Sequence, residues 1–235
     1  VVLPGRCRAD LDRLSAAFGA KFERGPDEVK DLPAHFGKRG GPPDLSGHDL
    51  RIFAEIVDAS ALSLDALAAR AGRLRAAGAD VIDLGCLPDT PFPQIEAAIA
   101  RLKAEGLAVS VDSADPQELA RGAAAGADYL LSLTEHNLDL AGAARPVLIP
   151  AQHGDLDSLV RAHAGALARG LKPILDPILD PIHFGFADSL ARYRELRARL
   201  PDAELMMGTG NLTELTEADS AGVTAMLLGL CSELR

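Results

Sequence analysis

The chain has 235 residues, of which 48% are hydrophobic and only 4% aromatic, and its formal net charge is −10 at pH 7. This length suits one large domain or a barrel with an extension, and the composition indicates an aliphatic, alanine-rich core. The acidic balance argues against a nucleic-acid partner, because proteins that bind the phosphate backbone usually carry basic patches. We find no uncharged run long enough to cross a bilayer and no signal peptide, so we predict no membrane partner.

The cysteines indicate a reducing compartment. Cys7, Cys86 and Cys231 are odd in number and widely spaced, which is typical of free thiols in the cytoplasm. No Cys/His cluster has zinc-ligand spacing, so we assign no metal ligands. We therefore predict a cytoplasmic protein.

Residues 1–50 differ in pattern from the rest of the chain. Leu11, Leu14, Phe18 and Phe22 have the spacing of one helical face, which predicts a helix over 11–22. Loop-forming glycines and prolines follow it, up to about residue 50. We interpret 1–50 as an N-terminal extension or the tail of an upstream domain, and 51–235 as a barrel domain. Because the chain starts with Val, we expect the natural protein to be longer.

From residue 52 onward, short apolar runs alternate with alanine-rich helical segments such as 62–77 and 94–105. The sequence Ala-Gly-Ala-Asp precedes two of the runs, and its glycine suits a helix end that leads into a strand. Nearly unbroken apolar strands that alternate with helices predict an α/β fold with a parallel sheet covered on its faces, here a (β/α)8 TIM-type barrel. The predicted strands lie at about 52–57, 81–86, 108–112, 129–133, 146–150, 173–176 and 204–208.

The last segment, 220–235, is apolar enough for an eighth strand. However, Val223, Met226, Leu227 and Leu230 have helical spacing, and Asp219 or Ser220 can cap the start. We therefore predict a helix here and seven strands in this chain. The eighth strand of the barrel is expected to lie beyond Arg235.

Polar side chains gather where the predicted strands end, which is the face on which barrel enzymes place their functional groups. The set is rich in acids and amides and poor in Lys and Arg. Such a surface suits a flat heterocycle with N–H donors, because a carboxylate accepts two parallel N–H bonds and an asparagine both donates and accepts. The set comprises Asp58, Asp83, Cys86, Asp112, Ser113, residues 134–137, Gln152, His153, Asp176 and residues 207–211.

Structural alternatives stay open for the main candidates. Asp83 could be an interior acid held by a neighbour, and Asp112 could cap the following helix. Asp176 stands before a proline, where a strand must stop. Asn211 follows Gly-Thr-Gly, whose backbone either approaches a ligand, such as an anion, or only makes a turn.

Three further residues attract weaker functional interpretations. Asp180 repeats the Asp-Pro motif and is expected to shape its loop. His183 lies in a Phe-Gly-Phe loop, as a lid residue or a proton-transfer group. Cys86 has no base paired with it in the sequence, which favours a packing role over a nucleophile.

These strand ends together resemble the pterin-binding barrel family, which contains dihydropteroate synthase and the pterin domains of methyltetrahydrofolate-dependent methyltransferases. The matching segments are residues 77–85 (AGADVIDLG), 109–113 (VSVDS), 174–177 (ILDP) and 207–211 (MGTGN). Residues 24–33 and 208–216 resemble a dihydropteroate synthase-like subgroup that has an extra N-terminal domain and is linked to tetrahydromethanopterin metabolism.

The resemblance implies a pterin substrate or cofactor, optional Mg²⁺, and a homodimer. Asp112 and Asp176 resemble the acids that contact the pterin and are the implied catalytic residues. Asp83, Asn137 and Asn211 join them as implied pterin-binding residues. The implied reaction is transfer of a pterin methyl group to an arylamine, as in folate-type biosynthesis.

Several departures from the family pattern leave the reaction open. Val57 stands where the family usually has Asn, and 86–91 (CLPDTP) lacks the arginine of the synthase loop. Ser132 and Thr134 are the nearest counterparts of another family asparagine. A synthase needs positive charge for its diphosphate leaving group, whereas a methyltransferase that uses a reduced pterin does not. We therefore keep a methyltransferase and a non-catalytic pterin-binding subunit as alternatives.

Overall fold

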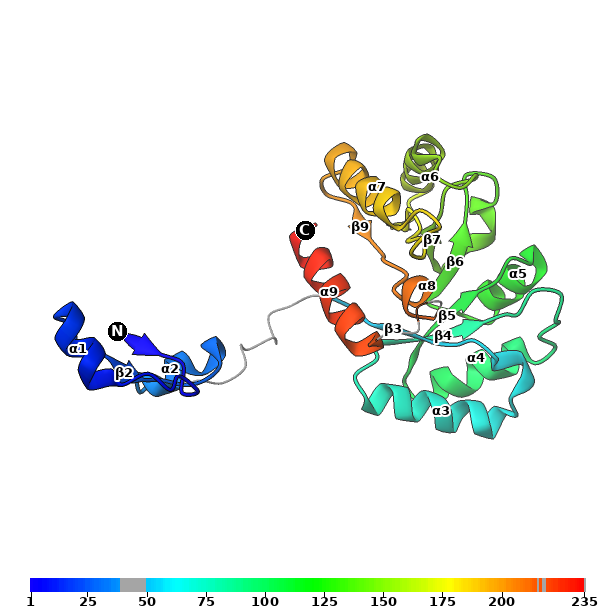
Figure 1. Ribbon diagram of the computed structural model, residues 1–235. Helices are drawn as coiled ribbons and strands as arrows, with labels where there is room; N and C mark the ends of the chain where they lie inside the picture. Colours follow the sequence, from blue (N-terminus) through cyan, green and yellow to red (C-terminus); the bar gives the residue numbers. More distant parts are fainter. Residues whose placement is uncertain (39–49, 215, 217–218, 235) are drawn as a thin grey trace. The chain divides into compact units, whose positions relative to one another are not determined.

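The computed structural model describes residues 1–38, 50–214, 216 and 219–234. The chain divides into two compact units, Val1–Leu50 and Arg51–Arg235, drawn together in Figure 1. Within these described ranges, no helix has both the length and the apolar character required to cross a membrane.

The first unit has a small parallel sheet of two strands, β1 (Val2–Leu3) and β2 (Glu23–Arg24), joined through helix α1 (Leu11–Phe18). The short helices η1 (Val29–Asp31) and α2 (Leu32–His35) follow. Helix α1 starts where the carboxylate of Asp10 accepts the amides of Asp12 and Arg13. It ends at Gly19, whose φ of 62° is left-handed, so the helix predicted over 11–22 is four residues shorter.

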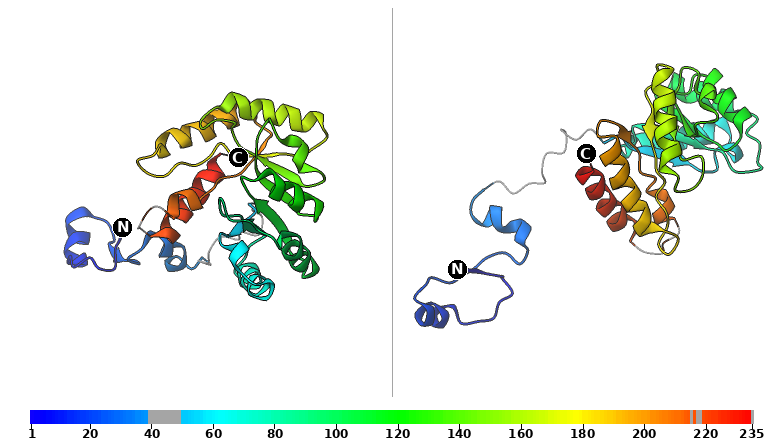
Figure 2. Two further views of the ribbon diagram at one scale, coloured as in Figure 1. Left: turned by 90° about the vertical axis from the view of Figure 1, so that its right-hand side faces the viewer. Right: turned by 90° about the horizontal axis from the view of Figure 1, so that it is seen from above.

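The second unit is built on a sheet of seven parallel strands in the order β3-β4-β5-β6-β7-β8-β9. The sheet curls into an incomplete barrel with α3 to α7 around its outside (Figures 1 and 2). The strands are β3 (Phe53–Ile56), β4 (Val81–Gly85), β5 (Ala108–Asp112), β6 (Tyr129–Leu133), β7 (Arg145–Leu148), β8 (Ile174–Leu175) and β9 (Glu204–Leu205). The helices are η2 (Ala59–Ala61), α3 (Leu64–Ala76), α4 (Ile95–Ala104), α5 (Pro116–Ala124), η3 (Leu138–Ala141), α6 (Leu156–Ala168), α7 (Phe186–Arg199), α8 (Gly210–Thr213) and α9 (Ser220–Glu233).

Alternate residues of each strand belong to two separate apolar layers. The outward layer packs strand residues such as Ile82 and Leu84 against helix residues such as Leu67 and Ile95. The inward layer fills the closed end of the barrel with a smaller cluster. Its members are Val81, Tyr129, Leu131, Val147 and Ile174, with Phe53, Ala108 and Met206 partly buried beside them.

The prediction of an α/β barrel-type fold is confirmed, with seven strands in the barrel sheet among the described residues. Strand β8 has only two residues, because Pro173 and Pro177 on either side lack an amide donor. The predicted C-terminal helix is α9, and the carboxylate of Asp219 caps it by accepting the amide of Gly222. Gly78, with φ 111°, is a left-handed residue just after a helix, as its motif predicted.

Candidate functional site

The strand register brings inward-facing acids together near the carboxyl ends of β3, β4 and β5. Glu55 pairs with Asp83 across β3 and β4, and Asp83 pairs with Ser110 across β4 and β5. One level further along, Gly85 pairs with Asp112. Since alternate strand residues face the same side, these positions share the inner face of the sheet.

A cavity of about 560 Å³ opens at this end of the barrel. Its wall mixes carboxylate, hydroxyl and amide groups with apolar side chains, which is the usual composition of a small-molecule site. The lining residues are Glu55, Val57, Gly85, Cys86, Leu87, Pro88, Asp112, Ser113, Ala114, Ser132, Thr134, Asn137 and Ile149.

Asp112 lies in the wall of this cavity and accepts a hydrogen bond from the Ser132 hydroxyl at Oδ1, at 2.6 Å. Burial raises the pKa of the Asp112 carboxyl, and the Ser132 hydrogen bond partly offsets that rise. Asp112 does not cap the following helix, because Asp115 does so by accepting the amide of Gln117. The side chain is therefore free to act in the cavity.

Asp83 is not among the residues that line the cavity, and its side chain is buried. It accepts the Ser110 hydroxyl at 2.6 Å. Burial, with the charges of Asp112 and Glu55, raises the pKa of the Asp83 carboxyl to about 7, against the lowering effect of Ser110. Asp83 is thus an interior acid held by a neighbour, which fits the structural alternative.

Glu55 is a cavity residue that the sequence analysis did not single out. Its pKa is raised by burial and by the charges of Asp112 and Glu214. Gly85 makes room for it, because a Cβ at Gly85 would collide with Oε1 of Glu55 and lie 3.0 Å from Cα of Val57. The signal available was the two-residue period of the strand, which places Phe53, Glu55 and Val57 on one face.

Glu55, Asp83 and Asp112 together could hold a metal ion. One carboxylate oxygen from each lies within 4.8 Å of the others. An all-oxygen donor set of this kind matches the preference of hard cations such as Mg²⁺. The sequence analysis assigned no metal ligands, since it searched for Cys and His spacing.

Asp176 follows β8 and is oriented by two donors. Its Oδ1 accepts the amide of Ile178 and the hydroxyl of Tyr193, each at 2.8 Å. Burial raises the pKa of Asp176 to about 6; these two hydrogen bonds lower it and the charge of Asp112 raises it. Both donors reach Oδ1, so Oδ2 keeps its capacity for a ligand.

Asn211 lies beside Asp176, across Gly208. A Cβ placed on Gly208 would be 3.3 Å from Nδ2 of Asn211 and 3.8 Å from Oδ2 of Asp176. The Asn211 amide donates to the carbonyl of Leu179 at 3.1 Å and its side chain is exposed. The Gly-Thr-Gly segment, which runs into the single-turn helix α8, therefore brings the Asn211 amide close to the Asp176 carboxylate.

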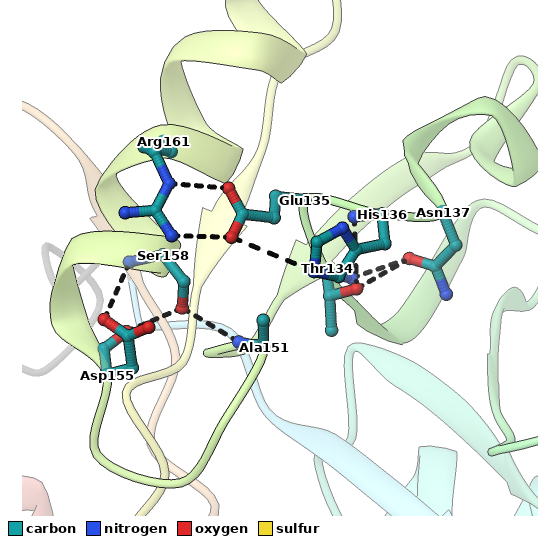
Figure 3. Close-up of polar contacts among 8 residues, drawn as sticks. All are labelled: Thr134, Glu135, His136, Asn137, Ala151, Asp155, Ser158 and Arg161. Carbon is teal, nitrogen blue, oxygen red and sulfur yellow. Dashed lines mark hydrogen bonds and ion pairs between the residues drawn. The ribbon is translucent and has the colours of Figure 1, made fainter.

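Asn137 enters the cavity from the loop after β6 (Figure 3). Its Oδ1 accepts the amide of Thr134 at 2.7 Å, which leaves Nδ2 turned away from Thr134. Glu135, between them, forms a two-pronged ion pair with Arg161 of α6 at 2.7 and 2.8 Å. This pair ties the loop to a helix and so holds Asn137 in place.

Other predicted candidates have structural partners. Asp58 pairs with Arg70 of α3 at 2.6 Å. Asp180 is buried and joins Arg192 at 2.6 Å and His153 at 2.8 Å, which agrees with the loop-shaping role expected for it.

His183 and Cys86 are two further candidates, and Cys86 lines the same cavity as Asp112. His183 lines a separate hollow of about 320 Å³ in the loop before α7. The pKa of the Cys86 thiol is raised to about 12, by burial first and then by Glu118, so the thiol is not an activated nucleophile.

No family model matches the chain. An uncharacterized protein of Methanocaldococcus jannaschii is 31% identical over 210 residues, which are 79% of this chain and 39% of that protein. The chain thus spans about two fifths of the length of this curated relative.

Solved structures of dihydropteroate synthases share the architecture. The enzyme from Thermus thermophilus superposes with a TM-score of 0.57 at 21% identity, over 80% of this chain and 83% of that one. The Xanthomonas albilineans enzyme in complex with 7,8-dihydropteroate has a TM-score of 0.53 at 22% identity, over 78% and 83%. Residues 51–235 therefore have the barrel fold of the dihydropteroate synthases, with seven of its strands within this chain.

Proposed function

We propose that this protein binds a pterin at the carboxyl ends of its strands and belongs to the dihydropteroate synthase-like, pterin-binding proteins. The observation that carries the proposal is the placement of two acids, Asp112 and Asp176, on this fold. Each has one oxygen held by the protein and one left for a ligand.

A pterin suits these groups chemically. Its amino-pyrimidinone edge presents adjacent N–H donors, which one carboxylate accepts in parallel. Asp176 takes this role, while Asp112 binds a second edge of the ring. Asn137 and Asn211 supply amide groups to the remaining ring atoms. Asp83 supports this set from behind Asp112.

The reaction we propose is transfer at the pterin methyl position, in which the pterin and its methylene carbon pass together to an arylamine, in biosynthesis of a tetrahydromethanopterin or folate-type carrier. The arylamine nitrogen forms a bond to the pterin methylene carbon, the bond from that carbon to the diphosphate oxygen breaks, and the amine loses a proton. Asp112 and Asp176 hold the ring so that this carbon faces the acceptor. Diphosphate departs with increased negative charge, which needs a cation.

The residues that line the cavity include no lysine or arginine. Glu55, Asp83 and Asp112 would hold Mg²⁺, which would supply the positive charge that the leaving group needs. Coordination favours the ionised carboxylates, so it would also lower the raised pKa values of these three groups.

Two other functions have some support. Asn211 beside Asp176 fits a methyltransferase that uses a reduced methylpterin, which requires no diphosphate site. The lack of a cavity cation also fits a non-catalytic pterin-binding subunit. In all three cases we propose a cytoplasmic protein that forms a homodimer.

The test is calorimetric titration of the full chain with a dihydropterin, its diphosphate and a reduced methylpterin, each with and without Mg²⁺. Asp112→Asn and Asp176→Asn are compared with Asp139→Asn, because Asp139 is an exposed acid on η3 that pairs with Arg169. We expect both site variants to lose affinity at least tenfold and the control to match the parent protein.

The relative affinities for these ligands distinguish the three proposed functions. Tighter binding of the diphosphate only with Mg²⁺ supports the synthase reaction. Preference for the methylpterin supports methyl transfer, and binding without turnover supports the non-catalytic subunit. Absence of binding to every pterin would overturn the proposal and leave only the fold.

A further inference from the structure

Ser132 has an unusual backbone conformation for a residue within a strand. Its φ is 65°, in the left-handed region that non-glycine residues rarely adopt. On the β7 side, Leu130 of β6 pairs with Pro146, and the next pair is Leu133 with Leu148. Strand β6 therefore advances three residues while β7 advances two, which defines a β-bulge with one extra residue.

The bulge changes the direction of the Ser132 side chain. Leu131 belongs to the inward apolar layer, whereas Leu130 and Leu133 belong to the outward one. A regular strand would point residue 132 outward with Leu130. Instead, Ser132 lines the cavity next to Leu131, and its hydroxyl donates to Oδ1 of Asp112 at 2.6 Å.

This contact has a specific consequence for Asp112. Among the described residues, Ser132 is the one that donates a hydrogen bond to the Asp112 carboxylate. The neighbouring groups Glu55 on β3 and Asp83 on β4 are acids and repel its charge. A single donor on Oδ1 thus fixes the rotation of the carboxylate and keeps Oδ2 for a ligand.

Backbone strain beside a binding residue is a reason to look for function, since such strain persists only where the surroundings impose it. We propose that Ser132 is a positioning residue, which the bulge in β6 turns into the cavity to orient Asp112 toward the pterin. The inference rests on the proposed function, because it takes Asp112 to be a pterin contact.

The coupling between Ser132 and Asp112 in dihydropterin affinity provides a readout that a purely structural role would not change. If Ser132 acts by donating to Oδ1 of Asp112 at 2.6 Å, the loss caused by removal of its hydroxyl disappears once Asp112 no longer offers a carboxylate. A purely structural role would cause the same loss whether or not that carboxylate is present.

The experiment uses Ser132→Gly and Ser132→Ala. Both lack the hydroxyl, but glycine adopts a φ of 65° without strain and alanine does not. We expect both to bind the dihydropterin about tenfold more weakly at pH 7. In the Asp112→Asn background, Ser132→Gly should cause no further loss.

Two results would overturn the inference. One is a dihydropterin affinity that changes in parallel with protein stability, so that Ser132→Gly binds like the parent protein and Ser132→Ala binds more weakly. The other is an equal loss from Ser132→Gly with and without Asp112.

The Asp112→Asn variant distinguishes failure of this inference from failure of the proposed function. Absence of dihydropterin binding to the parent protein would refute the proposed function. Undiminished binding by Ser132→Gly, together with a loss in Asp112→Asn, would refute the positioning role alone.

Discussion

The amide of Ile178 donates to Oδ1 of Asp176 at 2.8 Å from a left-handed backbone with φ 67°. A β-branched residue rarely adopts this conformation. The same relationship holds for Ser132, whose left-handed backbone accompanies its hydrogen bond to Asp112. Each of the two principal candidate acids is therefore held by a donor from a strained, non-glycine residue.

We expect Ile178→Gly to keep the amide that orients Asp176 while removing the strain. Relief of the left-handed backbone strain stabilises the fold by about 1–2 kcal/mol. The greater conformational entropy that glycine loses on folding, about 0.5–1 kcal/mol, and the lost side-chain contacts offset this gain. The free energy of unfolding should therefore change by less than about 1 kcal/mol, with dihydropterin affinity unchanged. Urea unfolding measures the free energy of unfolding, and calorimetry measures the affinity for the dihydropterin. Ile178→Val is the matched variant that keeps the backbone strain. A large loss of affinity in the glycine variant alone would contradict the assignment.

Tyr193→Phe tests the second donor to Asp176. The Tyr193 hydroxyl lowers the pKa of Asp176, which burial raises to about 6. Its removal raises that pKa further, so more of the acid is protonated at pH 7 and fewer molecules present a carboxylate to the pterin. We expect weaker binding at pH 7 and recovery at pH 8–9, in a titration series across pH. An affinity profile that keeps its shape would count against Asp176 as a ligand contact.

The local pattern of the sequence was enough to predict the parallel sheet, the positions of its seven strands and the start of the last helix. Apolar runs with proline or glycine at their borders locate β4, β5 and β8, and Asp219 marks the start of α9. These features depend on residues close together in the chain, so spacing reveals them.

Contacts that depend on strand pairing were not predictable in the same way. Glu55 was not predicted, because the candidate chosen for this strand was Asp58, the polar residue that follows it. Asp58 pairs instead with Arg70, outside the barrel. The role of Ser132 depends on a bulge, and no local signal marks the extra residue in β6. The two-residue period could have located Glu55, whereas Ser132 required the register between β6 and β7.

Asp83→Asn should reveal how much the buried carboxylate of Asp83 lowers the free energy of unfolding. The pKa of Asp83 is raised from its ordinary value to about 7, so the folded protein keeps a proton that the unfolded chain releases near pH 4. The resulting stability is fully present below about pH 4 and is lost as pH rises through 7. Asparagine still accepts the Ser110 hydroxyl and has no charge to bury.

We therefore expect Asp83→Asn to exceed the parent protein in unfolding free energy by a few kcal/mol at pH 8, with the difference vanishing toward pH 4. Urea unfolding at several pH values measures this, and Asp139→Asn serves as the exposed control. An equal difference at all pH values would mean that the buried charge is not its cause.

Arg192 holds the loop between β8 and α7 through several hydrogen bonds. Its guanidinium donates to the carbonyls of Pro177 and Ile178 and to the buried Asp180, the last at 2.6 Å. In Arg192→Met, the buried Asp180 carboxylate keeps its contact with the exposed His153 but loses the guanidinium. We therefore expect the free energy of unfolding to fall by about 3 kcal/mol. His153→Ala, which removes an exposed partner, should cost less than about 1 kcal/mol.

A double-mutant cycle with Asp180→Asn separates the ion pair from the backbone contacts of Arg192. Since Asp180→Asn removes the uncompensated charge, the double variant should recover part of the loss caused by Arg192→Met. The part that persists measures how strongly the carbonyl contacts hold Pro177 and Ile178, and through them Asp176. Strict additivity of the two substitutions would show that Arg192 stabilises this loop through its backbone contacts alone.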